Sequence, residues 1–393
     1  MKYSNLLQNL PTQFFSSLVQ QVNKAISEGR DVINLGQGNP DQPTPPHIVE
    51  ELQRSAANPS THKYSPFRGR ENLKKAICTF YEKEYGVSLD YEKEVAILFG
   101  GKSGLVELPM CFCNEDDIVL APDPGYPDYL SGISLANAKS YFLPLEIENN
   151  FLPKYEAIPS DVLEKAKLLF LNYPNNPTGA CATKEFFEET VTFGKENNII
   201  VAHDFAYGAI GFGEEKPRSF LQTPGAKEVG VELYTLSKTY NMAGWRIAFA
   251  VGNAEVIEAI NLIQDHMYVS LFPAIQDAGV EALLHGSDSV NELVQLYKTR
   301  RDAFIKKCHS IGWEVVAPAG SFFVWLPVPK GFTSVQFSTY ILEHANVAVA
   351  AGAGFGEYGE GYVRVGLVET KERLLEAVER IEKCNLFKEK SVK

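Results

Sequence analysis

Short apolar runs and amphipathic segments alternate between about residue 94 and residue 252. Each run has only three to six residues, and it lacks the polar alternation of a strand that faces water on one side. Continuous apolar strands separated by helical segments are typical of a mostly parallel sheet covered by helices on both faces. We therefore predict an α/β fold, with strands at residues 95–99, 118–120, 168–171, 199–202, 231–236 and 247–251.

Two amphipathic helices are predicted ahead of this region. In each, apolar residues recur at intervals of three and four, which places them on one face. Gly29 is expected to end the first helix. The apolar positions are Phe15, Leu18, Val19, Val22 and Ile26 in the first helix and Leu73, Ile77, Phe80 and Tyr81 in the second.

The pattern changes after about residue 285. A long helical stretch at 290–311 is followed by strands at 322–326, 347–349 and 362–366 and by a last helix at 369–381. This grouping predicts a smaller α+β domain, which the N-terminal helix completes. We expect a large domain at residues 31–285 and a small domain made of residues 1–30 and 286–393. The charged tail from Lys388 is expected to fray.

Composition narrows the class of protein. A chain of 393 residues fits two domains, and 45% hydrophobic with 22% charged residues is ordinary for a soluble protein. The net charge of -12 argues against non-specific nucleic-acid binding, but it leaves room for a local basic pocket that holds a small anion. Neither a signal peptide nor an apolar run of membrane-spanning length is found. We therefore expect a cytoplasmic protein with no nucleic-acid or membrane partner.

The six cysteines are scattered along the chain. Cys111 and Cys113 stand two apart, which is not the C-x-x-C spacing of zinc or redox sites. We interpret all six as free thiols in a reducing compartment, and we predict no metal site.

Polar and small residues follow five of the predicted strands. In open α/β sheets the ligand lies beyond the carboxyl ends of the strands, so we expect these segments to converge on one site. The loop at 36–41 is not G-x-G-x-x-G, which excludes a dinucleotide fingerprint. The converging segments are 100–103, 123–126, 172–179, 204–207 and the turn at Lys238.

Lys238 stands between two apolar runs, 231–236 and 247–251. Lysine is depleted from strands and is rarely buried without a partner. A covalent bond to a cofactor aldehyde would remove the cost of an isolated buried ammonium. A solvated loop lysine is the alternative, and this stretch alone leaves both interpretations open.

Further positions suit an anionic, ring-containing ligand. Gly100–Ser103 opens a predicted helix whose N-terminus suits a phosphate, although it could be a plain helix start. Arg246 can fork onto the same phosphate. Asp204 ends a buried strand and needs a partner, for which a protonated pyridine nitrogen would serve. The adjacent His203 should point to the opposite face, and we interpret it either as structural or as a residue that supports the site without contacting the ligand.

Four motifs together resemble the class I/II aminotransferases, which are pyridoxal-phosphate enzymes of fold type I. They are Asn176-Pro177-Thr178-Gly179, Asp204-x-x-Tyr207, Ser237-Lys238 with Arg246 eight residues on, and Val363-Arg364-Val365. The resemblance covers nearly the whole chain in order and spacing. It implies a mostly parallel seven-stranded sheet flanked by helices, pyridoxal 5'-phosphate as cofactor, and transamination between an amino acid and a 2-oxo acid.

The resemblance also implies a role for each site residue. Lys238 would hold the cofactor and move the substrate α-proton, and Asp204 would bind the ring nitrogen. Tyr207 and Asn176 would bind the ring hydroxyl, and Tyr126 would stack on the ring. The phosphate would be held by Gly101, Lys102, Arg246 and either Thr235 or Ser237. Tyr64 would reach the phosphate of a neighbouring subunit, which implies a homodimer with shared active sites. The substrate carboxylate would be bound by Arg364, with help from Asn176 and the backbone at Gly38.

The substrate side chain is less well defined. Aspartate enzymes of the best-known subgroup carry a second arginine after the cofactor lysine, and residues 264–284 contain none. Phe14, Phe15, Tyr268 and Phe272 could line an apolar pocket or simply pack. Segments 11–15 and 34–43 resemble the bacterial methionine-salvage transaminases, which favours the conversion of 2-oxo-4-methylthiobutanoate to methionine. The alternatives are an aspartate, alanine or diaminopimelate aminotransferase, a C–S β-lyase or acyl-CoA-dependent synthase, and a non-catalytic regulatory module.

Overall fold

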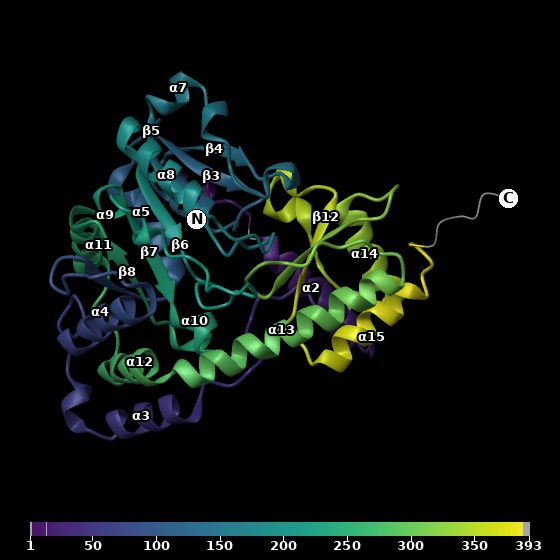
Figure 1. Ribbon diagram of the computed structural model, residues 1–393, viewed down its shortest axis with the longest axis horizontal. Helices are drawn as coiled ribbons and strands as arrows, with labels where there is room; N and C mark the ends of the chain where they lie inside the picture. The colour runs from purple at the N-terminus through teal and green to yellow at the C-terminus, as the bar shows by residue number, and fades with distance from the viewer. Residues whose placement is uncertain (1, 13, 388–393) are drawn as a thin grey trace.

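A seven-stranded sheet forms the centre of the computed structural model, which describes residues 2–12 and 14–387 but not the side chains of Phe14 and Phe15. Its strand order is β2-β8-β7-β6-β5-β3-β4 (Figure 1). Only β8 runs antiparallel to its two neighbours, so the predicted mostly parallel sheet is confirmed. The strands are β2 Val95–Leu98, β3 Ile118–Asp123, β4 Lys139–Pro144, β5 Ala166–Asn172, β6 Ile200–Asp204, β7 Gly230–Thr235 and β8 Ala248–Gly252.

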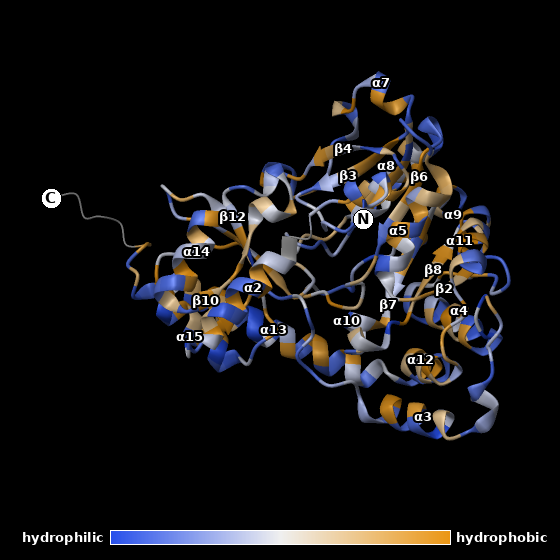
Figure 2. Cartoon of the chain, turned by 180° about the vertical axis from the view of Figure 1, so that it is seen from behind, coloured by the Kyte–Doolittle hydropathy of each residue, from blue (hydrophilic) through white to orange (hydrophobic). Residues whose placement is uncertain are grey.

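The sheet is buried on both faces, which explains its continuous apolar strands. Successive residues of a strand point to opposite sides. Val201 accordingly packs in one core and Ala202 in the other. Figure 2 shows the central strands as largely hydrophobic, whereas the helices around them carry both hydrophobic and hydrophilic residues. The first core is covered by α3 Pro46–Ala56, α4 Glu71–Tyr85, α8 Lys184–Asn197 and α12 Pro273–His285, and the second by α5 Gly101–Phe112, α6 Tyr129–Leu135 and α11 Ala254–Met267.

The C-terminal part of the chain builds a separate core around a small antiparallel sheet of order β11-β12-β9. The helix α13 Ser287–Ser310 leads from the α12 side of the large sheet to this second unit (Figure 1). The predicted division of the chain at residues 31 and 285 stays a prediction. The elements are β9 Phe323–Pro327, α14 Ser334–Ala345, β10 Val347–Ala348, β11 Ala350–Ala351, β12 Tyr362–Gly366 and α15 Lys371–Glu382.

One local prediction needs correction, and one strand was not predicted. The strand predicted at 347–349 is divided, because β10 pairs in parallel with β1 Ile33–Asn34 whereas β11 pairs with β12. β4 was not predicted from the apolar pattern, since it is a half-exposed edge strand. The predicted N-terminal helix is confirmed as α2 Phe14–Ser27, and among its described side chains Val22 and Ala25 are buried whereas Val19 and Ile26 are about half exposed. The predicted fraying from Lys388 falls outside the described residues.

Within the described ranges, no helix is long and apolar enough to cross a membrane. The same residues contain no cluster of histidine, cysteine, aspartate and glutamate that could hold a metal ion. All six cysteines are free thiols.

Candidate active site

A cavity of about 290 Å³ opens beyond the carboxyl ends of the strands, where the small sheet faces the large one. All the predicted site residues except Tyr64 line it, although some of them lie more than 300 residues apart in the sequence. The predicted lining residues are Gly38, Gly101, Lys102, Tyr126, Asn176, Asp204, Tyr207, Thr235, Ser237, Lys238, Arg246 and Arg364.

Lys238 lies in the one-turn helix α10 Leu236–Thr239, directly after β7. Its Nζ donates to the backbone oxygen of Gly38 over 2.8 Å. Burial lowers the pKa of Lys238 to about 8, and repulsion from Arg364 and Arg246 acts in the same direction. The amine therefore loses its proton more readily than a solvated lysine does, as a nucleophile or general base requires.

Asp204 ends β6 and enters the cavity from the sheet. Burial raises its pKa to about 6, and a hydrogen bond from Tyr129 Oη to Oδ2 (3.0 Å) opposes that rise. The backbone N–H of Ala206 donates to Oδ1 over 3.3 Å. The two hydrogen bonds offset only part of the cost of burying this carboxylate, so it is suited to a cationic ligand.

The raised pKa of Asp204 predicts a stability effect in the cofactor-free protein. The folded state binds more protons than the unfolded state between pH 4 and 6, so this group makes the free energy of unfolding fall as pH rises through that window. Asp204→Asn removes the ionisable group, and it should raise the free energy of unfolding at pH 7 by up to about 3 kcal/mol. The gain should shrink towards pH 4. Urea unfolding at both pH values checks this, and a loss of stability at pH 7 would contradict it.

A corner suited to an anion forms where α5 begins. Gly100 caps α5 with φ of 86°, and a Cβ there would lie 2.1 Å from a terminal nitrogen of Arg246. Glycine therefore lets the guanidinium rest against the helix N-terminus, whose first N–H groups lack intrahelical partners. The ammonium of Lys102 pairs with Asp128 over 2.9 Å, so its backbone N–H is the part that remains suited to an anion.

Thr235 and Ser237 both line this corner. Thr235 Oγ1 caps α10 by accepting from the backbone N–H of Ser237 (3.1 Å), and it donates to Ser237 Oγ over 2.8 Å. The two hydroxyls are therefore joined as a connected pair at this corner.

On the opposite wall of the cavity, the buried Arg364 projects from β12. It donates to Asn176 Oδ1 over 2.8 Å and to the backbone oxygen of Gly36 over 2.9 Å. Its guanidinium lies over the Phe323 ring, 4.1 Å from the centroid. A buried planar guanidinium that lines the cavity is well placed to receive a carboxylate.

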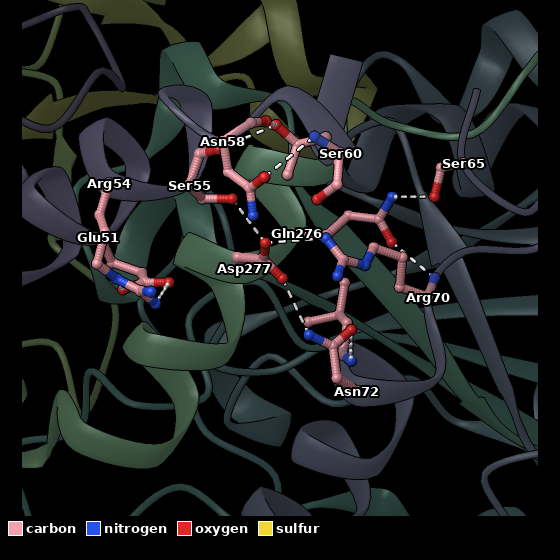
Figure 3. A network of polar contacts seen from close by, with 12 residues as sticks. Glu51, Arg54, Ser55, Asn58, Ser60, Ser65, Arg70, Asn72, Gln276 and Asp277 are labelled. Atoms are coloured by element: carbon pink, nitrogen blue, oxygen red, sulfur yellow. Dashed lines mark hydrogen bonds and ion pairs between the residues drawn. The ribbon is translucent and has the colours of Figure 1, made fainter. Parts of the chain in front are cut away.

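Tyr64 lies apart from the cavity and is 87% exposed. The loop that carries it is nevertheless fixed by α12, as Figure 3 shows. Gln276 donates to Ser65 Oγ over 3.2 Å and accepts from the backbone N–H of Arg70 over 2.8 Å, and Asp277 pairs with the Arg70 guanidinium over 2.8 Å. An exposed tyrosine on a well-anchored loop is suited to contact another molecule.

Sequence reasoning missed several residues that shape the cavity. Tyr129 is one, because its hydroxyl donates to the Asp204 carboxylate. Asn172 begins the predicted converging segment 172–179 but was assigned no role: its amide donates to the backbone oxygen of Asp204 (2.8 Å) and accepts from the N–H of Asn176 (2.7 Å). The other unpredicted lining residues are Leu105, Ala206, Ala243 and Phe323.

The two described side chains of the suggested apolar pocket, Tyr268 and Phe272, lie outside the cavity. Tyr268 packs on Phe99 with ring centroids 4.8 Å apart, and Phe272 is 42% exposed. The suggested roles of Phe14 and Phe15 fall on side chains outside the structure's description.

The model of the aminotransferase class I and II family matches residues 30–381. The chain belongs to this family. As an aminotransferase, it is similar to the L-glutamine--4-(methylsulfanyl)-2-oxobutanoate aminotransferase of Bacillus subtilis, with 64% identity over 389 residues, which is 99% of this chain and 98% of the relative. It is also 44% identical to the LL-diaminopimelate aminotransferase of Halothermothrix orenii, over 98% of this chain and 99% of the relative.

Solved structures agree with the fold of this aminotransferase. Apo-BacF from Bacillus subtilis superposes with a TM-score of 0.95 at 51% identity, covering 98% of this chain and 99% of that one. An aminotransferase from Staphylococcus aureus gives 0.92 at 41% identity, covering 98% and 100%. The family is generally dependent on pyridoxal phosphate, and fold type I is confirmed for this chain.

Proposed function

We propose that this aminotransferase uses pyridoxal 5'-phosphate to transfer amino groups to 2-oxo-4-methylthiobutanoate and to related apolar 2-oxo acids, with methionine as a principal product. The observation that carries the substrate class is the 64% identity to a relative named for that acceptor. That relative is also named for L-glutamine, which we therefore propose as an amino donor.

The residues of the cavity fit the cofactor. The corner formed by Gly101, the Lys102 N–H, Thr235, Ser237 and Arg246 suits the phosphate, and the Asp204 carboxylate suits a protonated ring nitrogen. Tyr126 offers a face for stacking, while the hydroxyl of Tyr207 and the amide of Asn176 suit the ring hydroxyl. All of these residues line the same cavity as Lys238. Bound pyridoxal phosphate would supply an electron-withdrawing ring that makes the α-proton of an amino acid acidic.

The protein's own groups would then orient the substrate and move its proton. Arg364 would grip the α-carboxylate through a bidentate fork, supported by Asn176 and the backbone at Gly38. Lys238 Nζ would accept the α-proton and deliver it to the cofactor carbon. A pKa of about 8 suits both roles near neutral pH, because neither protonation state is strongly disfavoured.

Tyr64 bears on the proposed oligomeric state. We propose a cytoplasmic homodimer in which Tyr64 of each chain reaches the phosphate site of the other. Its 87% exposure and its loop anchored by Gln276 and Asp277 support this role. Free thiols at all six cysteines fit a reducing compartment.

Single-turnover half-reactions test the substrate class. Methionine, leucine, phenylalanine, glutamine, aspartate and LL-diaminopimelate are mixed separately with the holoenzyme, and the visible absorbance of the cofactor is followed. We expect methionine to react at least about tenfold more efficiently than aspartate. Residues 264–284 contain no second arginine that could bind the side-chain carboxylate of aspartate. A strong preference for aspartate or LL-diaminopimelate over methionine would overturn the substrate assignment. Pyruvate and ammonia release from cystathionine would favour the C–S lyase instead.

A further inference from the structure

Behind Asp204, on the opposite face of the sheet, lies a fully buried pair formed by His203 and Glu232. The two are register partners on β6 and β7, so their side chains share a face. His203 Nδ1 lies 2.8 Å from Glu232 Oε2. Because adjacent residues of a strand point in opposite directions, His203 faces away from the cavity into which Asp204 points. The prediction that His203 does not contact the ligand thus agrees with its placement.

The Glu232 carboxylate is held by three further donors. Tyr81 Oη and Ser219 Oγ donate to Oε1 over 2.8 Å and 2.7 Å, and the backbone N–H of Phe220 donates to Oε2 over 2.8 Å. An ionised carboxylate only accepts hydrogen bonds, and here both of its oxygens are engaged twice. Glu232 is therefore fixed in place, and it fixes the imidazole plane of His203 in turn.

The second ring nitrogen of His203 reaches the loop that borders the substrate site. Nε2 lies 3.0 Å from the backbone oxygen and 3.3 Å from the backbone nitrogen of Tyr173. Tyr173 opens the segment that carries Asn176, and Asn176 Oδ1 accepts from the Arg364 guanidinium over 2.8 Å. Polar contacts at either end of the backbone segment 173–176 thus connect the core of the sheet to the arginine at the cavity.

We propose that His203 is a positioning residue for substrate binding: its imidazole, oriented by Glu232, holds the Tyr173 peptide and thereby sets where Asn176 and Arg364 meet the substrate carboxylate. This rests on the proposed function, which gives that carboxylate to Arg364. A buried polar pair is often no more stabilising than apolar residues of the same volume, so stability alone is a weak reason for this one.

Two substitutions separate the contacts of the imidazole. Asparagine places an amide near the position of Nδ1, so His203→Asn keeps a donor for Glu232 and loses the Tyr173 contact. Glutamine reaches the position of Nε2, so His203→Gln keeps the Tyr173 contact and leaves Glu232 with its three other donors. Thr190→Val is the matched control, because it removes a buried hydrogen bond to Tyr155 (2.8 Å) elsewhere in the same core.

Binding of 4-methylsulfanylbutanoate to each holoenzyme is measured by titration calorimetry. This acid has no amino group, so the measurement needs no turnover. We expect the Kd to rise about tenfold in His203→Asn and to stay within about threefold of wild type in His203→Gln. Thr190→Val should bind as wild type does, even where its melting temperature falls as far as that of His203→Asn.

An unchanged Kd in His203→Asn, with only a lower melting temperature, would overturn the proposal and leave His203 a purely structural residue. Equal weakening in all three variants would also overturn it, because general destabilisation would then account for the effect. Arg364→Met is measured alongside to separate the two hypotheses. If binding survives in Arg364→Met, the proposed carboxylate site itself is wrong. If it is lost there but kept in His203→Asn, only the role of His203 fails.

Discussion

Replacing Lys238 with alanine is expected to lower kcat by about a thousandfold or more while the protein remains folded. In the proposed function this amine both bonds the cofactor and moves the α-proton, and a positioned acid-base group contributes about 10²–10⁴-fold by itself. The variant should still bind pyridoxal phosphate weakly through the phosphate corner and Asp204. Its visible spectrum should lose the band of the lysine-bound cofactor.

Lys74→Met provides a matched control for the loss of a lysine. Lys74 in α4 is also buried, and burial also lowers the pKa of its ammonium, but it does not line the cavity. The control should retain kcat and the visible band. Turnover at the wild-type rate in Lys238→Ala would show that the assigned role is wrong.

Replacing Arg364 with alanine is expected to act on substrate binding. Truncating one partner of a buried charge pair costs about 2–5 kcal/mol, which corresponds to a fall in kcat/KM of roughly 30-fold to several thousand-fold. The KM values for the amino acid and the 2-oxo acid should both rise, because both carry the same carboxylate. Steady-state kinetics with methionine and 2-oxo-4-methylthiobutanoate measure this, and the cofactor spectrum should be unchanged.

Arg300 is the appropriate comparison, since it is about equally buried but does not line the cavity. Its terminal nitrogens contact the two carboxylate oxygens of Asp41 at 2.8 Å and 2.7 Å. Arg300→Met should lower the free energy of unfolding but leave KM close to that of the wild type. If Arg364→Ala and Arg300→Met changed KM alike, Arg364 would have no special place in substrate binding.

The central sheet was predictable because its inner strands are buried on both faces. Six apolar runs gave six of its seven strands, and the polar residues at their carboxyl ends predicted where the cavity lies. β4 was missed since an edge strand with half-exposed side chains has no continuous apolar pattern. Val19 and Ile26 of α2 show the opposite case, in which apolar residues that follow the helical pattern are about half exposed. Periodicity alone does not say which part of an apolar face is covered.

Site residues were predictable where their chemistry was unusual for their position. A lysine between apolar runs and a carboxylate at the end of a buried strand each needed a partner. Tyr129 was not conspicuous in this way, because a buried tyrosine ordinarily packs, and here it stacks on Phe170 with centroids 4.7 Å apart. Its hydroxyl reaches Asp204 only through the packing of α6 on the sheet, which no local pattern specifies.

The link from Glu232 through His203 to Tyr173 was equally inaccessible to sequence reasoning. The two ends of the pair are 29 residues apart, and they meet because β6 and β7 are neighbours with a particular register. Spacing along the chain carries no information about that register.

Peptide mapping after borohydride reduction of the purified holoenzyme tests the central claim most directly, since reduction makes the bond between a lysine and pyridoxal phosphate permanent. The mass of a reduced pyridoxal phosphate adduct should appear on the peptide that contains Lys238, in a stoichiometry close to one per chain. An adduct confined to another lysine, such as Lys102 or Lys74, or the absence of any adduct from protein that retains its visible band, would contradict the account.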